Sequence, residues 1–534
     1  MRSAVLVFVA LMWLPALAGS PDVAESSGFR LKPEATQASV VTDRRAKLAP
    51  AFADIDRLFT EFAKTAHAPG AAWGIIVDGQ LAHSGSTGVR DVASNAPVDA
   101  DTVFRIASMT KSFTAMAILK LRDEGKLSLD DPAERYVPEL KGLAYPTSDS
   151  PRITIRHLLT HSAGFPEDNP WGDQQLADTE DDLSRMLRSG IPFSTAPGTA
   201  YEYSNYGFAI LGRIVSRVSG MAYDDYVAGA ILKPLGMTST TLHPSRVAAN
   251  RLAIGYRWED ERWKEEPALP HGSFGAMGGM LTSIRDLSRY VAAHLDAFPA
   301  RSGPETGPVR RASLREMQQA WRSSAMFVTR DPATNAPNLT ASSYGYGLSV
   351  TQTCQFRTMV AHGGGLPGYG SLMRWLPDAN VGIIAFANVT YAGWGRVLNE
   401  AFDRLASTGG LQPREERPSQ ALIDAQRSVS ELVEGWRDDL ADRVAAQNLF
   451  LDRSKDRRQR EIDDLRTKVG ACKPPDRFDY VENALRGQWT LSCERGNLQV
   501  RITLAPTMPP KVQAMVVRIA PPQPAGPPRT CTGF

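Results

Sequence analysis

The sequence predicts an α+β protein with an antiparallel sheet flanked by helices. Of its 534 residues, 43% are hydrophobic and 22% charged, which is ordinary for a globular chain that buries a large core. The expected elements come as a helix and a hairpin, then a block of helices, then strands closed by a helix. This order differs from the strand–helix alternation that builds parallel sheets. A change of composition beyond a linker at residues 408–419 predicts a second, smaller α+β domain.

The first 20 residues have the features of a secretory signal peptide. Arg2 supplies a positive charge, and residues 4–14 (AVLVFVALMWL) form an apolar run too short to span a bilayer. Ala16-Leu17-Ala18 then fits the small-x-small cleavage pattern. We therefore expect an exported protein, periplasmic or secreted, with residues 21–50 as a polar tether and no membrane span in the mature chain.

Residues 51–407 contain the larger set of expected elements. Residues 51–66 place apolar side chains at helical spacing, which predicts an amphipathic helix. Asp78-Gly79 lies between two β-rich runs and predicts a hairpin, because both central positions of such a turn need positive φ. We expect further helices at 108–125, from Pro151 to Gly164, at 204–236 and at 394–405, with strands at 344–351 and 357–362 and a hairpin over 371–389.

The region beyond residue 407 differs in composition. Residues 408–419 (TGGLQPREERPS) are expected to be a linker. Residues 420–469 are charged with a helical pattern, and residues 485–519 contain three strand-like runs, two of them joined around Gly496-Asn497. We therefore predict a small domain at 420–519, followed by a Pro-rich tail at 520–534.

The chain has four cysteines, which allow three pairings that sequence alone does not choose between. Cys472 follows the end of a charged helix, and Cys493 lies in a strand of the same small domain. An exported protein meets an oxidising compartment, so pairing is expected. A helix end and a strand within one small domain suit a bridge, and we therefore predict a Cys472–Cys493 disulfide. On this prediction Cys354 is a buried free thiol and Cys531 is a mobile cysteine beyond the Pro-rich stretch.

Ser108-Met109-Thr110-Lys111 is a Ser-x-x-Lys sequence at the start of an apolar helix, and it occurs once in the chain. Residues three apart share a helix face, so the lysine amine can reach the serine hydroxyl. A desolvated lysine has a lowered pKa and can act as a base on the serine. The alternative is a helix-capping serine with a solvated lysine, which is the better interpretation for an isolated Ser-x-x-Lys.

Two further motifs are weak when taken alone. Tyr203-Ser204-Asn205 would direct a phenol and an amide to one place, where they could shuttle a proton and hold a substrate amide. His362-Gly363-Gly364-Gly365 follows a strand-like run, and its glycines would let a ligand approach the backbone N–H groups. The alternatives are a tyrosine packed on the core and a loop that needs only flexibility.

In this order, the three motifs resemble those of the serine β-lactamase and penicillin-binding protein superfamily, in its class C-like branch. The surrounding segments are similar to that branch too: residues 69–72 (PGAA), 153–164 (ITIRHLLTHSAG), 234–237 (PLGM) and 365–369 (GLPGY). The resemblance covers about residues 50–405 and implies a β-lactamase/transpeptidase-like fold, with a helical block beside the sheet.

The resemblance also implies roles for single residues. Ser108 would be the nucleophile that forms an acyl-enzyme, Lys111 would activate it, and Tyr203 would pass a proton to the leaving group. Asn205, His362 and Gly364 would contact the substrate, and the backbone N–H groups of Ser108 and Gly365 would form an oxyanion hole. No cofactor and no metal are implied, and His157 and His161 are expected to pack structurally.

The third motif departs from the Lys-Thr-Gly of many relatives, because His362 has no fixed charge at neutral pH and Gly363 has no hydroxyl. A substrate carboxylate would lack matched donors there. We therefore expect an exported serine hydrolase of small ester, amide or peptide substrates. The alternatives are a DD-carboxypeptidase or class C-like β-lactamase, and a catalytically silent binding or assembly protein. With 60 basic and 58 acidic residues we expect no nucleic-acid partner, and the oligomeric state is left open.

Overall fold

The computed structural model describes residues 44–520, except for 170, 331–336, 412–416 and 476. The expected signal peptide, most of the tether, Cys531 and nearly all of the Pro-rich tail lie outside these residues. None of the described helices is long and apolar enough to cross a membrane. Residues 44–411 and 417–520 are described below each by itself.

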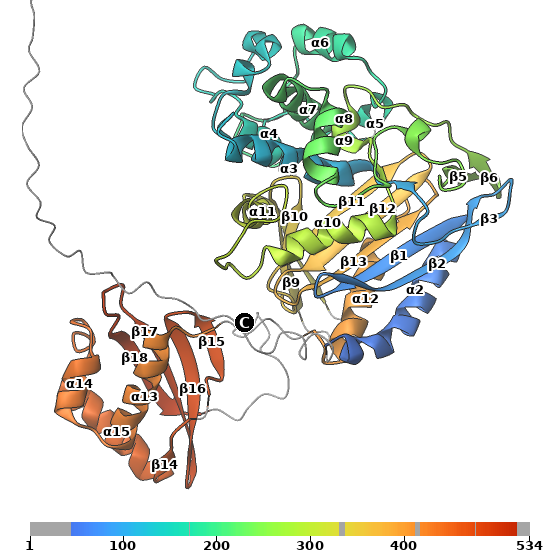
Figure 1. The fold of residues 1–534 in the computed structure, drawn as a ribbon. Helices are drawn as coiled ribbons and strands as arrows, with labels where there is room; N and C mark the ends of the chain where they lie inside the picture. The colour runs from blue at the N-terminus through green and yellow to red at the C-terminus, as the bar shows by residue number, and fades with distance from the viewer. Residues whose placement is uncertain (1–43, 170, 331–336, 412–416, 476, 521–534) are drawn as a thin grey trace, which may run out of the picture. The chain divides into compact units, whose positions relative to one another are not determined.

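Residues 44–411 contain an antiparallel sheet of nine strands in the order β3-β2-β1-β13-β12-β11-β10-β9-β8 (Figure 1). In that order the strands are Ala96–Pro97, Gln80–Asp91, Gly70–Val77, Val381–Ala387, Tyr369–Leu376, Met359–Leu366, Ser349–Thr353, Pro337–Tyr344 and Arg322–Arg330. The antiparallel sheet and the mixed helix and strand content confirm the predicted α+β class.

The two faces of the sheet face two separate hydrophobic cores. Strand β1 is buried at every position, which explains its nearly continuous apolar sequence. Its alternate residues divide between the cores: Trp73 and Ile75 face α2 (Phe52–Thr65) and α12 (Gly395–Ser407), whereas Ile76 faces the other side. That other side is covered by α10 (Ile284–Asp296) and the helical block (Figure 1).

The predicted hairpin between β1 and β2 is confirmed. Val77 pairs with Gln80, which leaves Asp78 and Gly79 as a two-residue turn, and both have positive φ, 49° and 78°. The expected strand at 344–351 is wrong in its extent, because β9 ends at Tyr344 and β10 begins only at Ser349. Gly347, with φ of 65°, lies in the break between them. Strand β8 was not predicted, because its sequence does not alternate between apolar and polar residues. Its apolar side chains are exposed in the structure.

The helical block is more broken than the sequence predicts. The helix expected from Pro151 to Gly164 is only α4 (Ile155–Leu159), because His161 and Gly164 both adopt positive φ. The run at 204–236 is α7 (Asn205–Ser219), which ends at the left-handed Gly220, followed by α8 (Tyr223–Val227) and a π-helical turn. The block also contains α3 (Thr110–Asp123), α5 (Trp171–Gln174), α6 (Glu180–Ser189) and α9 (Gly275–Gly278), and α11 (Arg311–Met317) lies nearer the sheet.

Two short strand pairs complete the described part of residues 44–411. Strand β4 (Phe104–Arg105) pairs with β7 (Leu281–Thr282), and β5 (Tyr256–Glu259) pairs with β6 (Arg262–Glu265). The β4–β7 pair matters for function, because β4 leads directly into the Ser-x-x-Lys sequence.

Residues 417–520 have a hydrophobic core of their own. The helices α13 (Gln420–Glu434), α14 (Asp438–Val444) and α15 (Lys455–Val469) accompany a five-stranded sheet. Its strands are β14 (Cys472–Lys473), β15 (Tyr480–Asn483), β16 (Arg486–Cys493), β17 (Gly496–Leu504) and β18 (Val512–Ile519). The three longest match the expected strands, but the β16–β17 turn is at Glu494-Arg495 rather than around Gly496-Asn497. The exact domain boundaries stay predictions.

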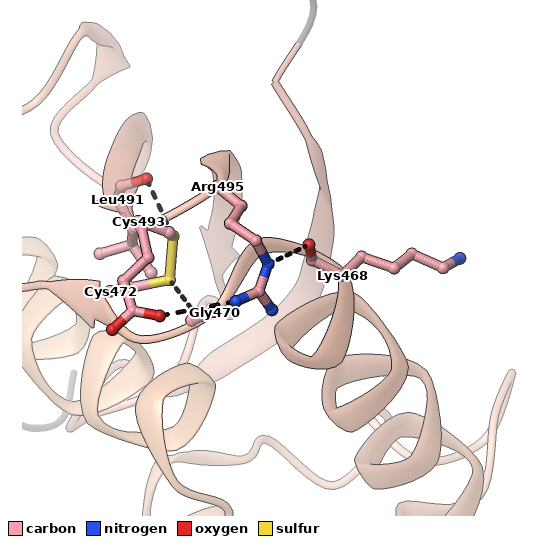
Figure 2. The surroundings of a disulfide bond; sticks show 7 residues. Lys468, Gly470, Cys472, Leu491, Cys493 and Arg495 are labelled. Carbon is pink, nitrogen blue, oxygen red and sulfur yellow. Dashed lines mark hydrogen bonds and ion pairs between the residues drawn. A yellow bond between two sulfur atoms is a disulfide. The ribbon is translucent and has the colours of Figure 1, made fainter.

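Cys472 and Cys493 form a disulfide, which is the pairing that the sequence predicts (Figure 2). They lie opposite each other on β14 and β16, and the bond closes a loop with a sequence separation of 21. The expectation that Cys354 is a buried free thiol is wrong, because Cys354 is disulfide-bonded. Cys354 directly follows β10 and is only partly buried.

Candidate active site

Ser108 lies in a 3-10 turn, η2 (Ala107–Met109), between β4 and α3. Ala107 adopts φ of 47°, which is costly for a residue with a side chain and marks the turn as held by its surroundings. Thr110 holds it: its hydroxyl donates to the Ala107 carbonyl at 2.7 Å and accepts the Met280 N–H at 3.1 Å. The serine is therefore presented on a fixed turn at the start of a buried helix.

Lys111 is fully buried, so the alternative of a solvated lysine is excluded. Its Nζ donates to Ser108 Oγ at 2.9 Å, to Asn205 Oδ1 at 2.6 Å and to the Met277 carbonyl at 2.9 Å. Burial lowers the pKa of Lys111 to about 7, against the opposing charges of Asp168 and Asp173. A large fraction of this lysine is therefore a neutral amine at neutral pH, within reach of the serine proton.

Tyr203 precedes α7, and its hydroxyl lies near enough to Ser108 for the serine hydroxyl to act on its pKa. Lys111 Nζ lies 4.8 Å from the centroid of its ring. Burial raises the pKa of Tyr203 well above its usual value, although the nearby Ser108 hydroxyl opposes that rise. The phenol is therefore protonated at neutral pH and can donate to, or relay a proton through, the serine oxygen.

Asn205 is the first residue of α7, and two neighbours orient it. Asp168 Oδ1 accepts the Asn205 backbone N–H at 2.7 Å, and Asn169 Oδ1 accepts from Asn205 Nδ2 at 2.6 Å. Because the amide nitrogen faces Asn169, the amide oxygen is left to accept from Lys111.

His362 lies on β11 and is neutral. Its Nδ1 is 2.6 Å from the Gly363 carbonyl oxygen and therefore donates, so its Nε2 accepts from the Tyr344 hydroxyl at 2.9 Å. Burial and the nearby Lys111 lower the pKa of His362 to about 3. The third motif thus places no positive charge beside Ser108.

The glycines of β11 differ in what surrounds them. An ideal Cβ on Gly364 would overlap the Ile106 carbonyl oxygen and lie 2.5 Å from Ser371 Oγ, so only glycine lets β11 approach the segment before Ser108. A Cβ on Gly363 would make only ordinary contacts, at 3.7 Å or more. Gly365, the expected oxyanion-hole residue, lies next on the same strand, against the ring of Tyr391.

The structure thus brings all residues of the three motifs to one place, together with several that the sequence did not indicate. These are the Met277 carbonyl, Asp168, Asn169 and Tyr344. The glycine-rich run at 275–279 (GAMGG) was the available signal for Met277. His161 is buried and packs structurally, as expected: its ring lies 4.3 Å from that of Tyr203, and its Nδ1 accepts the Ser204 N–H at 3.0 Å. Among the described residues, no three His, Cys, Asp or Glu side chains gather as a metal site.

Comparison with known proteins gives consistent matches. The model of the Beta-lactamase family matches residues 55–408. Protein flp of Staphylococcus aureus strain COL is 28% identical over 341 residues, 63% of this chain and 62% of the relative. Penicillin-binding protein 4* of Bacillus subtilis strain 168 is 26% identical over 330 residues, 58% of this chain and 66% of the relative. The match therefore spans less than two thirds of the length of these curated relatives.

One solved structure supports the fold. The octameric penicillin-binding protein homologue from Pyrococcus abyssi aligns with a TM-score of 0.56 at 22% identity, over 85% of this chain and 91% of that one.

Proposed function

Because the chain belongs to the Beta-lactamase family, we propose that it hydrolyses small ester or amide substrates through an acyl-enzyme on Ser108. Membership of this family, with the penicillin-binding protein relatives, confirms the resemblance and the fold class that the sequence predicts. It also supports serine acyl-enzyme hydrolysis in general. The observation that carries the proposal for this chain is the 2.9 Å contact between Ser108 Oγ and the buried Lys111 Nζ.

In the proposed reaction, neutral Lys111 takes the Ser108 proton while Oγ attacks the substrate carbonyl carbon. The N–H groups of Ser108 and Gly365 stabilise the negative oxygen of the tetrahedral intermediate. The proton then passes by way of Tyr203 to the leaving alcohol or amine as its bond to the carbonyl carbon breaks. In the second half, water attacks the acyl-serine carbonyl carbon while neutral Lys111 takes one of its protons. That proton then passes to Ser108 Oγ as the bond between Oγ and the acyl carbon breaks, which releases the acid and restores Ser108 and neutral Lys111.

The two candidate bases differ in their pKa values. Lys111 has a pKa lowered to about 7, so its basic form is populated at neutral pH. The pKa of Tyr203 is raised well above its usual value, so its phenolate is not. This difference supports Lys111 as the base and Tyr203 as the relay.

The neutral His362 supports substrates without a carboxylate near this motif. A penicillin or a D-Ala-D-Ala peptide presents a carboxylate, which is costly to desolvate without a cation or hydroxyl donors. The alternative of a DD-carboxypeptidase or β-lactamase is supported by the similarity to penicillin-binding protein 4* of Bacillus subtilis. The alternative of a silent binding protein is disfavoured by the assembled contacts of Ser108, Lys111 and Tyr203.

The test is intact mass after incubation with p-nitrophenyl esters, D-amino-acid amides and penicillin. We expect an acyl adduct with the esters or amides that disappears in Ser108→Ala. The matched control is Ser112→Ala, one turn further along α3, whose hydroxyl donates to the Met109 carbonyl at 2.8 Å. An adduct that persists in Ser108→Ala, or no adduct with any substrate, would contradict the proposal.

We also propose export. The signal-peptide features of residues 1–20 support it, as does the Cys472–Cys493 disulfide, because such bonds persist in oxidising compartments. Fractionation of the producing cell, with the N-terminus of the mature protein read by mass spectrometry, tests this.

A further inference from the structure

We propose that Asp173 is a specificity-determining residue whose carboxylate binds an ammonium group on the acyl part of the substrate, in place of the Tyr391 hydroxyl. This inference rests on the proposed acyl-enzyme function and names the substrate class within it.

Tyr391 connects the two sides of the site. It follows β13 with φ of 53°, and its ring lies against Gly365, where an ideal Cβ would be 2.5 Å from Cδ1. At the far end of the same ring its hydroxyl donates to Asp173 Oδ2 at 2.8 Å. The side chain of Tyr391 therefore bridges Asp173 and Gly365, whose N–H group would bind the substrate carbonyl oxygen.

Asp173 belongs to the site through α5 as well. An ideal Cβ on the preceding Gly172 would lie 2.6 Å from the Asn205 Cβ, so α5 packs directly on the residue that holds Lys111. The Asp173 charge raises the pKa of Lys111, and the Lys111 charge lowers the pKa of Asp173, each against the larger effect of burial. Asp173 is only 3% exposed, and the hydrogen-bond donor to its carboxylate is a neutral phenol.

The chemistry of this arrangement favours a cation. A buried carboxylate is costly unless it is paired, and within the described part of the chain no Lys or Arg side chain forms an ion pair with Asp173. A substrate ammonium would supply a charge-assisted hydrogen bond, which is stronger than that from a phenol. Tyr391 is 48% exposed, so its hydroxyl can turn into water when it is displaced. We place the ammonium on the carbon next to the scissile carbonyl, which brings it beside the proposed oxyanion position.

The experiment compares two substrates of nearly the same shape. Alanine p-nitroanilide, in both hands, carries an ammonium at neutral pH where isobutyryl p-nitroanilide carries a methyl group. Alanine ethyl ester and ethyl isobutyrate form the corresponding ester pair. We expect the native protein to favour the ammonium substrate in kcat/KM by about 10- to 100-fold, as for a hydrogen bond to a charged group.

Asp173→Asn keeps an acceptor for Tyr391 but removes the charge, and we expect the preference to fall to about one. Any change in the basicity of Lys111 affects both substrates alike, so the ratio isolates recognition of the ammonium. Tyr391→Phe removes the competing donor, and we expect it to keep or increase the preference. Asp178→Asn, a carboxylate shortly after α5, serves as the control with an unchanged ratio.

Several results would overturn the inference: a native ratio near one, an equal fall for both substrates in Asp173→Asn, or a Tyr391→Phe ratio as low as that of Asp173→Asn. If Ser108-dependent hydrolysis of the isobutyryl substrates persists in these cases, only the ammonium site is refuted. If no substrate acylates Ser108, the proposed function itself fails.

Discussion

Gly364→Ala tests whether the close approach of β11 to the nucleophile segment matters for catalysis. The new methyl group would overlap the Ile106 carbonyl oxygen and lie 2.5 Å from Ser371 Oγ, which itself donates to that carbonyl at 3.0 Å. Non-bonded heavy atoms pack at about 3.5–4.0 Å, so the two segments must separate by about 1 Å. Ile106 precedes Ser108 by two residues, so this shift moves the serine relative to the strand that would bind the substrate.

The expected result is a large loss of activity with a modest loss of stability. A misplacement of about 1 Å costs on the order of 100-fold in rate, so kcat/KM for a p-nitrophenyl ester should fall by about that factor. Overpacking should lower the free energy of unfolding by about 1–3 kcal/mol, which leaves the protein folded. Thermal unfolding and steady-state kinetics measure the two effects.

Gly363→Ala is the matched control, because its Cβ meets Leu372 Cδ1 only at 3.7 Å. We expect kcat/KM within about threefold of the native value, since ordinary van der Waals contacts require no shift. If Gly364→Ala were as active as Gly363→Ala, the argument that β11 must touch the Ile106 carbonyl would be refuted.

Three further predictions concern Lys111, the third motif and the disulfide. Because burial disfavours the ammonium of Lys111 and lowers its pKa to about 7, kcat/KM should rise with pH up to about 7 and then level off. A rise in kcat/KM that continues to pH 10 would contradict Lys111 as the base. His362→Lys with Gly363→Thr should raise kcat/KM for a penicillin relative to that for an ester, because the pair supplies a cation and a hydroxyl; an unchanged ratio would show that this motif does not set specificity. Replacing Cys472 and Cys493 by serine should lower the free energy of unfolding of residues 417–520 by about 3 kcal/mol in the chain-entropy model, which denaturant titration measures. Acylation of Ser108 should stay unchanged. Loss of acylation would make this region part of the site.

The sequence by itself determined the features that depend on local geometry. The Asp78-Gly79 hairpin follows from the positive φ that both residues adopt. The Ser108–Lys111 contact follows from the three-residue spacing at the start of a helix. The order of the three motifs predicted the fold class. The helix end and the strand near Cys472 and Cys493 favoured one of three possible pairings, and the structure contains it.

Local sequence patterns gave wrong bounds for, or did not reveal, elements that depend on tertiary contacts. The expected helix up to Gly164 stops at Leu159, because the chain turns at His161 toward Ser204. The exposed strand β8 has no alternating pattern to reveal it, since it is held by its pairing with β9 rather than by burial.

Only the tertiary structure decided what the motif residues can do. Lys111 has its lowered pKa because burial removes water from it, and its partners Asn205 and Met277 lie 94 and 166 residues away in the chain. His362 is neutral because it is buried against Tyr344 and near Lys111. Spacing along the chain places side chains on a common face, but the desolvation that sets their protonation comes from segments distant in sequence.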